Sequence, residues 1–497
     1  MQISVYFPHE LQRALKNISP LVEKIYLVGG AIRDALLYKA SHDFDFIVKG
    51  DTIKMARNTA NILKGAFFVL DDEREYGRVL FTNEEGVLYI LDFTPLSRGN
   101  ILDDLQARDF TINAMAVDLA KPGELIDPFG AEKDLREKNL QTCTAESFAV
   151  DPVRVLRAIR FSINLGLEIH KDTQKALAKN VASLPDVSSE RKRDEIFRIL
   201  EGNSVTGAVQ MMDAFGMLPF IIPELVELVN FHQPPPHVMN GWEHTIKVLE
   251  YCEDMCSYFE KGAVDLNCPP ALQTAFKCLK TFQLQIQELF KQGFVSQRSI
   301  RGLFLMAALY HDVGKLHAQK KMIDGRIYFV DHGRISADLA VKRGQELALA
   351  NKELRWLKSV VGNHMLVRSI PLESEKVETR KAVFRFYRAA GASGIWVCLL
   401  SLADVLATYG ETLTQERWGK ALDRCDLLLD AWFNKQREWI SPDLIYNGND
   451  LQSKFGLLPG ATLGAILEKL REAQATGIVG NQKEADRLIM SAIKADQ

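Results

Sequence analysis

Short apolar segments alternate with polar and helical stretches over the first 140 residues, and helical periodicity replaces them afterwards. Strand-like apolar runs lie at 24–28, 43–48, 66–70, 78–82, 87–93 and 112–118. Such alternation is typical of an α/β unit around one sheet. After about residue 141, apolar positions follow a helical period, as in the amphipathic segments 415–433 and 462–475. The pattern predicts an α+β protein in which an α/β head precedes an all-helical body.

The helical part contains one clear interruption, three consecutive prolines at 234–236. A chain of 497 residues is too long for a single hydrophobic core. We therefore expect four domains: a head at 1–140, a helical neck at 141–230, a helical domain at 231–370 and a C-terminal helical domain at 371–497.

Composition narrows the class of protein. The chain is 47% hydrophobic and 25% charged, with a net charge of -3, so it is not a globally basic nucleic-acid binder and any RNA contact must come from local patches. We find no apolar run long enough to span a bilayer and no signal-peptide pattern at the N-terminus. The seven cysteines are scattered and odd in number, which is typical of reduced thiols. We expect a cytoplasmic protein without a membrane partner.

The most informative local feature is a pair of carboxylates, Asp43 and Asp45, which alternate with Phe44 and Phe46. Residues two apart on a strand point to the same face, so both carboxylates project together while the phenylalanines are buried. Paired carboxylates bind Mg²⁺, which can hold an attacking oxygen and a leaving phosphate. Asp92, at the end of another apolar run, could supply a third carboxylate and act as a base.

A glycine pair precedes these carboxylates. Gly29 and Gly30 follow the first apolar strand and open a helix near Ala31. Glycines there let the backbone approach a phosphate, and the helix N-terminus favours its negative charge. Arg33, in the first turn, adds a charge-assisted contact. The segment predicts a nucleotide phosphate site beside the metal site.

A third group of residues lies on a predicted helix at 151–161. Asp151, Arg154, Arg157 and Arg160 recur every third residue and would form a slanting stripe on one side of that helix. Aspartate and arginine together present acceptors and donors that can pair with the edge of a cytosine or adenine. Asp151 before Pro152 is also a good N-cap for a helix with proline at its first position, so the residues alone leave both interpretations open.

Four motifs occur in order and resemble one family: Gly-Gly-Ala-Ile-Arg-Asp (29–34), Asp-Phe-Asp (43–45), Arg-Asp-Phe-Thr-Ile-Asn-Ala-Met-Ala (108–116) and Asp-Pro-Val-Arg-Val-Leu-Arg-Ala-Ile-Arg-Phe (151–161). Over residues 22–230 the chain resembles the class II tRNA nucleotidyltransferase and poly(A) polymerase family, within the polymerase β nucleotidyltransferase superfamily. The resemblance implies a polymerase-β-like head. It also implies template-independent addition of C and A to tRNA 3′ ends from CTP and ATP, with Mg²⁺.

The resemblance also assigns roles. Asp43 and Asp45 match the metal ligands, and Asp92 matches the third acidic position. The positions matching nucleotide-binding residues are Gly29, Gly30, Arg33, Arg108, Asn113, Asp151, Arg154, Arg157 and Arg160. Among them, Asp151 and Arg154 match the residues that select the base, and Arg157 and Arg160 match arginines near the triphosphate.

Three departures from the family pattern affect how many nucleotides are added. Val150 replaces an acidic residue, Ala107 replaces an arginine, and the segment 93–107 is shorter than the flexible loop of many CCA-adding members. The shortness of that segment makes a specialist that adds only CC or only A one alternative to CCA addition. A poly(A) polymerase remains the other alternative on this scaffold.

The body carries a second group of metal-ligand residues. His311 and Asp312, in His-Asp-Val-Gly-Lys after an apolar helix, offer nitrogen and oxygen ligands to one divalent ion. A resemblance to the HD superfamily implies the other ligands: His244 and Asp404 match its metal site, and His332 and His364 occupy places that members with two metals often use. The ordered set resembles the HD superfamily, which implies a divalent metal of unknown identity and phosphohydrolase activity on phosphomonoesters or cyclic phosphodiesters. We expect His237, in the loop after the prolines, to be structural. A protein of another class, an HD phosphohydrolase whose head only binds RNA, is the remaining alternative.

Overall fold

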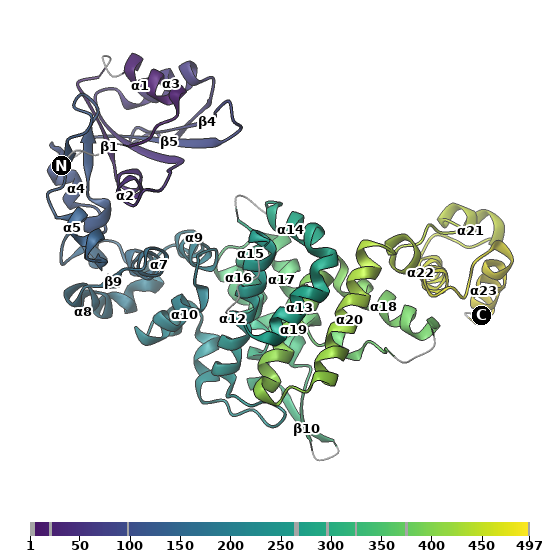
Figure 1. Ribbon diagram of the computed structural model, residues 1–497. Coiled ribbons are helices and arrows are strands. Elements are labelled where there is room, and N and C mark those ends of the chain that lie inside the picture. The colour runs from purple at the N-terminus through teal and green to yellow at the C-terminus, as the bar shows by residue number, and fades with distance from the viewer. Residues whose placement is uncertain are drawn as a thin grey trace. The chain divides into compact units, whose positions relative to one another are not determined.

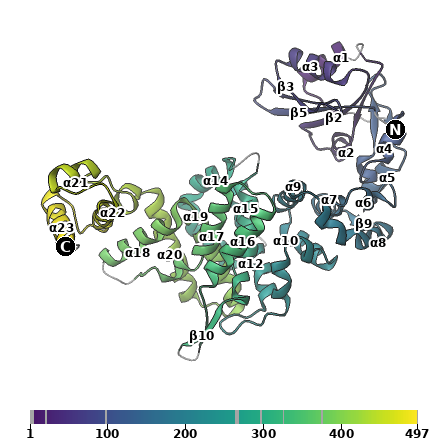
Figure 2. The same cartoon turned by 180° about the vertical axis from the view of Figure 1, so that it is seen from behind.

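The computed structural model describes residues 5–18, 22–96, 99–262, 268–294, 298–323, 326–372 and 376–495. The chain forms two compact units, Met1–Val187 and Ser188–Gln497, which are described separately below (Figure 1, and Figure 2 from behind). The boundary between these units falls inside the predicted neck at 141–230, and the predicted division into four domains stays a prediction.

The first unit is built on a seven-stranded mixed sheet in the order β3-β4-β5-β2-β1-β6-β7. Its strands are β1 (Lys24–Val28), β2 (Asp43–Lys49), β3 (Ala66–Asp71), β4 (Tyr76–Thr82), β5 (Leu88–Pro95), β6 (Ala116–Asp118) and β7 (Leu125–Ile126). The neighbours β2 and β5 run parallel, while every other neighbouring pair in this sheet is antiparallel. The predicted α/β head is therefore confirmed.

Helices cover the sheet from both sides. α1 (His9–Ile18) and α3 (Thr52–Leu63) lie on one face and α2 (Gly30–Leu36) on the other (Figure 1). The remaining helices of the unit are α4 (Ile101–Gln106), η2 (Thr111–Asn113), α5 (Ala131–Arg136), α6 (Ser147–Val150), α7 (Arg154–Leu165), α8 (Lys171–Asn180) and η3 (Val181–Asp186).

Alternation along β2 decides which side of the sheet carries the carboxylates. Phe44 and Phe46 are fully buried under α1 and α3, and Phe46 stacks on Phe93 of β5 with ring centroids 5.1 Å apart. Asp43 and Asp45 alternate with them and face the opposite side. Because a register slip of one residue would bury both aspartates, this aromatic layer fixes their position.

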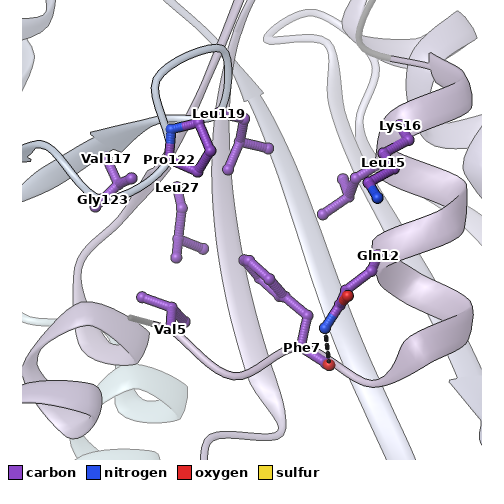
Figure 3. Close-up of a pocket in the computed structure, with 10 residues that line it drawn as sticks. All are labelled: Val5, Phe7, Gln12, Leu15, Lys16, Leu27, Val117, Leu119, Pro122 and Gly123. Carbon is purple, nitrogen blue, oxygen red and sulfur yellow. Dashed lines mark hydrogen bonds between the residues drawn. The ribbon is translucent and has the colours of Figure 1, made fainter. Parts of the chain in front are cut away.

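The face of the sheet that carries the phenylalanines also contains a cavity of about 410 Å³ between α1 and strands β1 and β6 (Figure 3). Its walls are mainly apolar, with Phe7, Leu15 and Leu27 among the lining side chains. Leu27 pairs with Phe46 in the register of β1 and β2. The cavity therefore lies on the face of the sheet opposite to Asp43 and Asp45.

Two expectations about strands are wrong. The run 112–118 is a strand only from Ala116, because Thr111–Asn113 form a turn of 3₁₀ helix whose side chains hydrogen-bond to Asp134 and Asp109. Strands also occur in the part expected to be helical. These are β9 (Glu168–Ile169), which pairs with β8 (Asn139–Leu140) at the end of the predicted head, and the hairpin β10 (Gln319–Ile323) and β11 (Arg326–Val330). The hairpin has exposed residues all along β10, so it gives no apolar alternation from which a strand could be predicted.

In its described residues, the second unit is helical apart from that hairpin. It contains α9 (Ser189–Leu200), α10 (Val205–Ala214), α11 (Leu218–Ile221), η4 (Pro223–Asn230), α12 (Gly241–Lys261), α13 (Pro270–Leu279), η5 (Lys280–Phe282), α14 (Gln283–Lys291), α15 (Ile300–Tyr310), η6 (Val313–Leu316), α16 (His332–Glu346), α17 (Asn351–Asn363), η7 (Leu366–Ser369), α18 (Lys376–Ala390), η8 (Gly391–Ser393), α19 (Gly394–Tyr409), η9 (Gly410–Thr412), α20 (Gln415–Phe433), η10 (Gln436–Ile440), α21 (Gly448–Phe455), α22 (Ala461–Thr476) and α23 (Gln482–Ala495). The amphipathic segments predicted at 415–433 and 462–475 correspond to α20 and α22. The prolines at 234–236 lie in the loop before α12, inside this unit rather than at its boundary.

The centre of the second unit is formed by α12, which packs against both α15 and α19. All residues of α15 are buried, and α19 is buried from Gly394 to Thr408. The segment Lys376–Thr412 is long and apolar enough to span a bilayer, so the expectation that no such stretch exists is wrong. However, 83% of its apolar window is buried inside the protein. It is a core segment. All seven cysteines are free, as predicted.

Candidate functional site

The three predicted carboxylates of the head come together. Asp43 and Asp45 lie on β2, and Asp92 lies directly beside Asp45 on the parallel strand β5. One carboxylate oxygen from each residue lies within 4.8 Å of the others. Burial raises the pKa of Asp45 to about 6, with Asp43 and Asp92 adding to the rise and Arg108 opposing it. Three acidic groups facing one point fit a divalent cation, whose charge would relieve their mutual repulsion.

Asp92 has a partner that the sequence analysis missed. Arg78 of β4 lies opposite Asp92 in the antiparallel register and donates two hydrogen bonds of 2.7 Å, one to each carboxylate oxygen. This fork fixes the orientation of Asp92. For Asp92 to act as a base or a metal ligand, it must share an oxygen with Arg78. The sequence predicted that Arg78 lies on a strand. Its pairing with Asp92 could not be predicted, because it depends on which strands are neighbours in the sheet.

The glycine turn and two arginines lie next to Asp45. Gly29 has a φ of 75°, and a Cβ there would lie 2.7 Å from Nη1 of Arg108 and 3.5 Å from Oδ2 of Asp45. Arg108 thus packs directly against the glycine backbone, which requires a residue without a side chain. Arg33 donates to Oδ1 of Asn113 at 2.7 Å and is also paired with Asp34. The structure therefore brings Gly29, Gly30, Arg33, Arg108 and Asn113 to one edge of the sheet.

The predicted helix 151–161 begins later than expected. Asp151 has an extended backbone with a φ of −148°, and α7 starts at Arg154. The reason is Pro152, whose ring excludes the residue before it from the helical region. Asp151 therefore lies outside the helix and does not share a helical stripe with the arginines. It stays beside Arg154, with 3.8 Å between Oδ2 and the guanidinium Nε.

The three arginines of α7 have different partners. Arg154 donates to the carbonyl oxygens of Ala107 at 2.8 Å and Arg108 at 3.3 Å, so it braces the Arg-Asp segment. Arg157 donates to the buried carboxylate of Asp109 at 2.8 Å. The guanidinium of Arg160 lies 4.3 Å from the ring centroid of Phe161.

Asp109 is a second residue that the sequence analysis missed. Burial by itself raises the pKa of its carboxyl, but the charge of Arg157 and hydrogen bonds from Asn113 and the amide of Phe110 lower the pKa below its ordinary value. Asp109 therefore ties α7 to the segment that carries Arg108 and Asn113. The sequence signal was available, since Asp109 is part of the same Arg-Asp motif.

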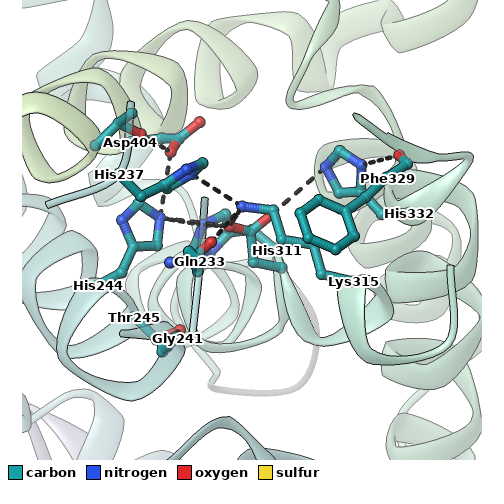
Figure 4. A network of polar contacts seen from close by, with 12 residues as sticks. Gln233, His237, Gly241, His244, Thr245, His311, Lys315, Phe329, His332 and Asp404 are labelled. Atoms are coloured by element: carbon teal, nitrogen blue, oxygen red, sulfur yellow. Dashed lines mark hydrogen bonds and ion pairs between the residues drawn. The ribbon is translucent and has the colours of Figure 1, made fainter. Parts of the chain in front are cut away.

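The histidine and aspartate residues predicted in the body also converge, from several helices (Figure 4). His244 of α12 has its Nε2 3.2 Å from Nε2 of His311, 3.4 Å from Oδ2 of Asp312 and 3.3 Å from Oδ1 of Asp404. All four side chains are nearly or fully buried. This arrangement of two imidazoles and two carboxylates fits a divalent transition metal.

A second group shares Asp312 with the first. His332 and His364 lie with their Nε2 atoms 3.3 Å apart and 3.5 and 3.7 Å from Oδ1 of Asp312. Oδ2 of the same carboxylate faces the first group. Asp312 thus lies between two clusters of ligand atoms, an arrangement that suits one carboxylate bridging two metal ions.

Backbone hydrogen bonds fix the imidazoles in a metal-binding form. Nδ1 of His311, His332 and His364 lies 2.7, 2.9 and 2.7 Å from the carbonyl oxygens of Ala308, Phe329 and Val361. Because a carbonyl only accepts, a neutral ring carries its proton on Nδ1 and directs the Nε2 lone pair to the centre. Burial and the neighbouring His332 lower the pKa of His364 to about 3. Facing lone pairs about 3 Å apart repel each other unless a cation lies between them.

The carboxylates have their own supports. Nζ of Lys315 lies 2.5 Å from Oδ2 of Asp312, and Arg368 lies 2.6 Å from Oδ2 of Asp404. Burial alone raises the pKa of Asp312, but the charge of Lys315 holds that pKa well below its ordinary value. Arg368 does the same for Asp404. Both carboxylates are therefore ionised, as metal ligands must be.

His237, which we expected to be structural, lies next to this centre. Its Nε2 is 3.1 Å from Nζ of Lys315, and its ring centroid is 5.4 Å from that of His244. Gln233 accepts a hydrogen bond from Lys315 at 2.7 Å. Burial and the charge of Lys315 lower the pKa of His237 to about 4, so the ring is neutral at pH 7. In the sequence, Gln233 and His237 lie on either side of the prolines at 234–236, and no motif there indicates a contact with Lys315.

Comparison with known proteins places the head and the neck in described families. The poly A polymerase head domain family matches residues 25–141, and a family described as the probable RNA and SrmB-binding site of polymerase A matches residues 166–228. A CC-adding tRNA nucleotidyltransferase of Geobacter sulfurreducens is 28% identical over 93% of this chain and 91% of its own length. An A-adding tRNA nucleotidyltransferase of Deinococcus radiodurans is 28% identical over 92% and 93%.

A CCA-adding enzyme of Bacillus pumilus is 33% identical over 71% of this chain and 88% of its own length. Among solved structures, a complex of CCA-adding enzyme with ATP shares 19% of its residues with this chain and has a TM-score of 0.60, over 99% of this chain and all of that one. At this identity the likeness concerns the fold.

Proposed function

Because this chain belongs to the family of tRNA nucleotidyltransferases, we propose that its head adds C and/or A from CTP or ATP to the 3′ end of tRNA. The observation that carries this proposal is the meeting of Asp43, Asp45 and Asp92 beside the glycine turn. We propose a cytoplasmic location, since tRNA and nucleoside triphosphates are the substrates.

Asp43, Asp45 and Asp92 would hold a divalent metal, which we propose to be Mg²⁺. When bound, the metal supplies charge neutralisation at the α-phosphate and lowers the pKa of the attacking 3′-hydroxyl. Arg78 keeps the carboxylate of Asp92 turned toward the other two. In this arrangement the three carboxylates define where the hydroxyl and the α-phosphate meet.

The rest of the nucleotide site follows from the neighbouring groups. The backbone at Gly29 and the N-terminus of α2 favour phosphate oxygens. Arg33 and Arg108 add charge-assisted donors, and Arg157 and Arg160 lie on the helix that follows. Asp151 and Arg154 lie side by side and present an acceptor and a donor for a base. Two of the amino groups of Arg154 already donate to the backbone, so we assign base reading to Asp151 and the remaining edge of Arg154.

The test is incorporation of labelled CTP and ATP into tRNAs that end before C, after CC and after CCA. Replacing Asp43 and Asp45 together by alanine should abolish incorporation, and the exposed Asp72→Ala is the matched control. Incorporation that survives the double replacement would mean that the assignment of the catalytic site to Asp43 and Asp45 of the head is wrong. The products also separate the alternatives: repeated A beyond CCA indicates a poly(A) polymerase, and arrest after CC or after one A indicates a specialist.

We favour the specialist. The segment 93–107 is short, and in its described part it is ordered into the end of β5 and the short helix α4, while residues 97–98 lie outside the described residues. Ala107 and Val150 lie beside Arg154 in one surface cavity of about 550 Å³. Relatives that add only CC or only A match the chain over almost its full length.

We further propose that the body is an HD-type metal-dependent phosphohydrolase. The observation that favours it is the pair of ligand clusters that share Asp312. His244, His311 and Asp404 would complete one metal site with Asp312, and His332 and His364 the other. Divalent metals bound there supply a water of lowered pKa and polarise a phosphoryl oxygen.

Two measurements test this second activity. Metal content should approach two ions per chain in the body after loading with Mn²⁺, and the loaded protein should hydrolyse a phosphomonoester or a cyclic phosphodiester. His311→Ala together with Asp312→Ala should remove both properties, whereas the nearby exposed His317→Ala should retain them. If the double variant still binds metal at this centre, the assignment of ligands is wrong.

A further inference from the structure

The face of the head sheet that carries the three carboxylates is covered by a helix over only part of its strands. On this face α2 packs against β1 and β2, whereas α3 packs against β3, β4 and β5 from the opposite face (Figure 1). The side chains that β3, β4 and β5 direct to the carboxylate face are exposed or half-exposed. Four large apolar ones in regular register form what we call the uncovered surface: Phe68, Leu80, Leu88 and Ile90.

The strand register places Phe68 in one row with two of the carboxylates. Phe68 of β3 pairs with Arg78 of β4, which pairs with Asp92 of β5. Asp92 pairs in turn with Asp45 of β2. Paired residues point to the same face, and neighbouring strands lie about 4.8 Å apart, so Phe68 is about 10 Å from Asp92 along this row.

The neighbouring row joins the rest of the uncovered surface to the carboxylates. Leu80 pairs with Ile90, and Ile90 pairs with Asp43. Both apolar side chains are half-exposed. Leu88, two residues before Ile90 on the same face of β5, is 52% exposed. The apolar surface therefore begins directly beside the metal-ligand carboxylates.

The glycine turn lies on the other side of the carboxylates. Gly29 follows β1, which neighbours β2 on the side away from β5. In phosphoryl transfer the attacking and leaving oxygens lie roughly in line with the phosphorus. A pyrophosphate that leaves toward the glycine turn therefore requires a hydroxyl that approaches from the side of β5. The uncovered surface lies on that approach.

The side chains of this region suit an unpaired RNA end. Phe68 is 48% exposed, so its ring is accessible to a base. Aromatic side chains stack on bases whatever the base identity, as an RNA end that changes with every addition requires. Arg78 donates to Asp92 through Nε and Nη2, which leaves Nη1 for a phosphate oxygen of the same RNA strand.

We propose that the uncovered surface binds the unpaired 3′ end of the tRNA, with Phe68 stacked on one of its last two bases. The proposal rests on the nucleotidyl transfer proposed for the head, and it assigns residues that lie outside the four sequence motifs. Phe68 is a positioning residue. It lies two strands away from Asp92 and acts by holding the RNA so that the 3′-hydroxyl stays beside the carboxylates.

Photocrosslinking tests the contact directly. The full-length protein is irradiated, without nucleoside triphosphate, with a tRNA that ends in CC and carries 5-iodocytidine at either of its last two positions. Peptide mapping should place the crosslink on the peptide that contains Phe68. Phe68→Ala should reduce its yield about ten-fold, while Val69→Ala, which is 41% exposed but on the other face of β3, should leave it unchanged. Crosslinks confined to other peptides, or a yield that Phe68→Ala leaves unchanged, would overturn the proposal.

Steady-state kinetics separates this proposal from the one it rests on. Phe68→Ala should raise KM for tRNA about ten-fold and leave KM for CTP and ATP unchanged, whereas Phe68→Tyr, which keeps a ring, should have the wild-type KM for tRNA. An equal rise in every KM, or no recovery in Phe68→Tyr, contradicts the proposed stacking while the nucleotidyl transfer stands. If the wild type extends no tRNA, the nucleotidyl transfer fails and the crosslink alone decides whether the uncovered surface binds RNA.

Discussion

The two glycines at the start of α2 should respond in opposite ways to replacement by alanine, although the sequence makes them look equivalent. Gly29 has φ 75° and ψ −131°, a combination that L residues rarely adopt, and a Cβ there would lie 2.7 Å from Nη1 of Arg108. Gly30 is the first residue of α2, and the nearest atom to its added Cβ, Nη2 of Arg33, is at an ordinary distance of 3.6 Å.

The expected magnitudes follow from these differences. A residue in a sparsely populated backbone region costs roughly 1–3 kcal/mol, and displacement of Arg108 adds to that cost. We expect Gly29→Ala to lower the free energy of local opening of the head by about 2 kcal/mol, which is about a 30-fold change in the opening equilibrium. Gly30→Ala should instead stabilise the helix by up to about 1 kcal/mol, because glycine is unfavourable inside helices.

Hydrogen exchange of peptides from β1 and α2 measures these free energies, and labelled CTP and ATP incorporation measures the consequence for activity. Gly29→Ala should accelerate exchange about 30-fold, which corresponds to about 2 kcal/mol. It should also reduce incorporation at least about ten-fold, because the new side chain forces Arg108 away from Asp45. Gly30→Ala should slow exchange and change incorporation less. If both variants exchange and react alike, or if Gly29→Ala behaves as wild type, the strain and close approach at Gly29 do not matter and the reasoning is refuted.

Three further predictions concern other parts of the molecule. Wild type should be more stable than Asp109→Asn, because Arg157 favours the ionised carboxylate and lowers its pKa in the folded state. This difference in the free energy of unfolding should be complete above about pH 5 and should shrink as the pH falls below 3.8. Acid titration of unfolding for both proteins measures it. Mn²⁺ at 100 times its dissociation constant should stabilise the body by about 2.7 kcal/mol, measured by hydrogen exchange. Asp312→Asn should remove this stabilisation, because Asp312 belongs to both groups of candidate ligands. An unchanged stabilisation in the variant would contradict the role of Asp312 as a ligand shared by two metals. Glu353→Ala should destabilise the body by about 3 kcal/mol in the same assay, because it leaves the largely buried guanidinium of Arg298 without its carboxylate partner. A loss below about 0.5 kcal/mol would mean that water takes the place of the carboxylate.

The residues that meet at the two candidate centres were predictable from local sequence and from motif resemblance. Alternation of Asp43 and Asp45 with two phenylalanines requires no knowledge of the fold, because residues two apart on a strand share a face. The glycine turn before α2 and the His311–Asp312 pair after an apolar helix were recognisable from their spacing, and the candidate ligands His244 and Asp404 from the resemblance to the HD superfamily. Each depends on spacing along the chain or on the order of motifs.

Other features depend on contacts between distant segments. Arg78 holds Asp92 only because β4 and β5 are neighbours in register, and Asp312 lies between two ligand clusters only because α12, α15, α16, α17 and α19 meet at one point. Arg154 was expected to face a base, yet it donates to carbonyl groups 46 and 47 residues away in sequence.

The sequence by itself determined which side chains are available for chemistry and which faces of strands and helices they occupy, because these follow from backbone geometry over a few residues. Tertiary structure alone decided the partners of those side chains: Arg78 for Asp92, Asp109 for Arg157, and Lys315 for both Asp312 and His237. The reason is physical. A buried charged or polar group is satisfied by whatever packing places within about 3 Å of it, and that neighbour is set by the whole fold rather than by the adjacent residues.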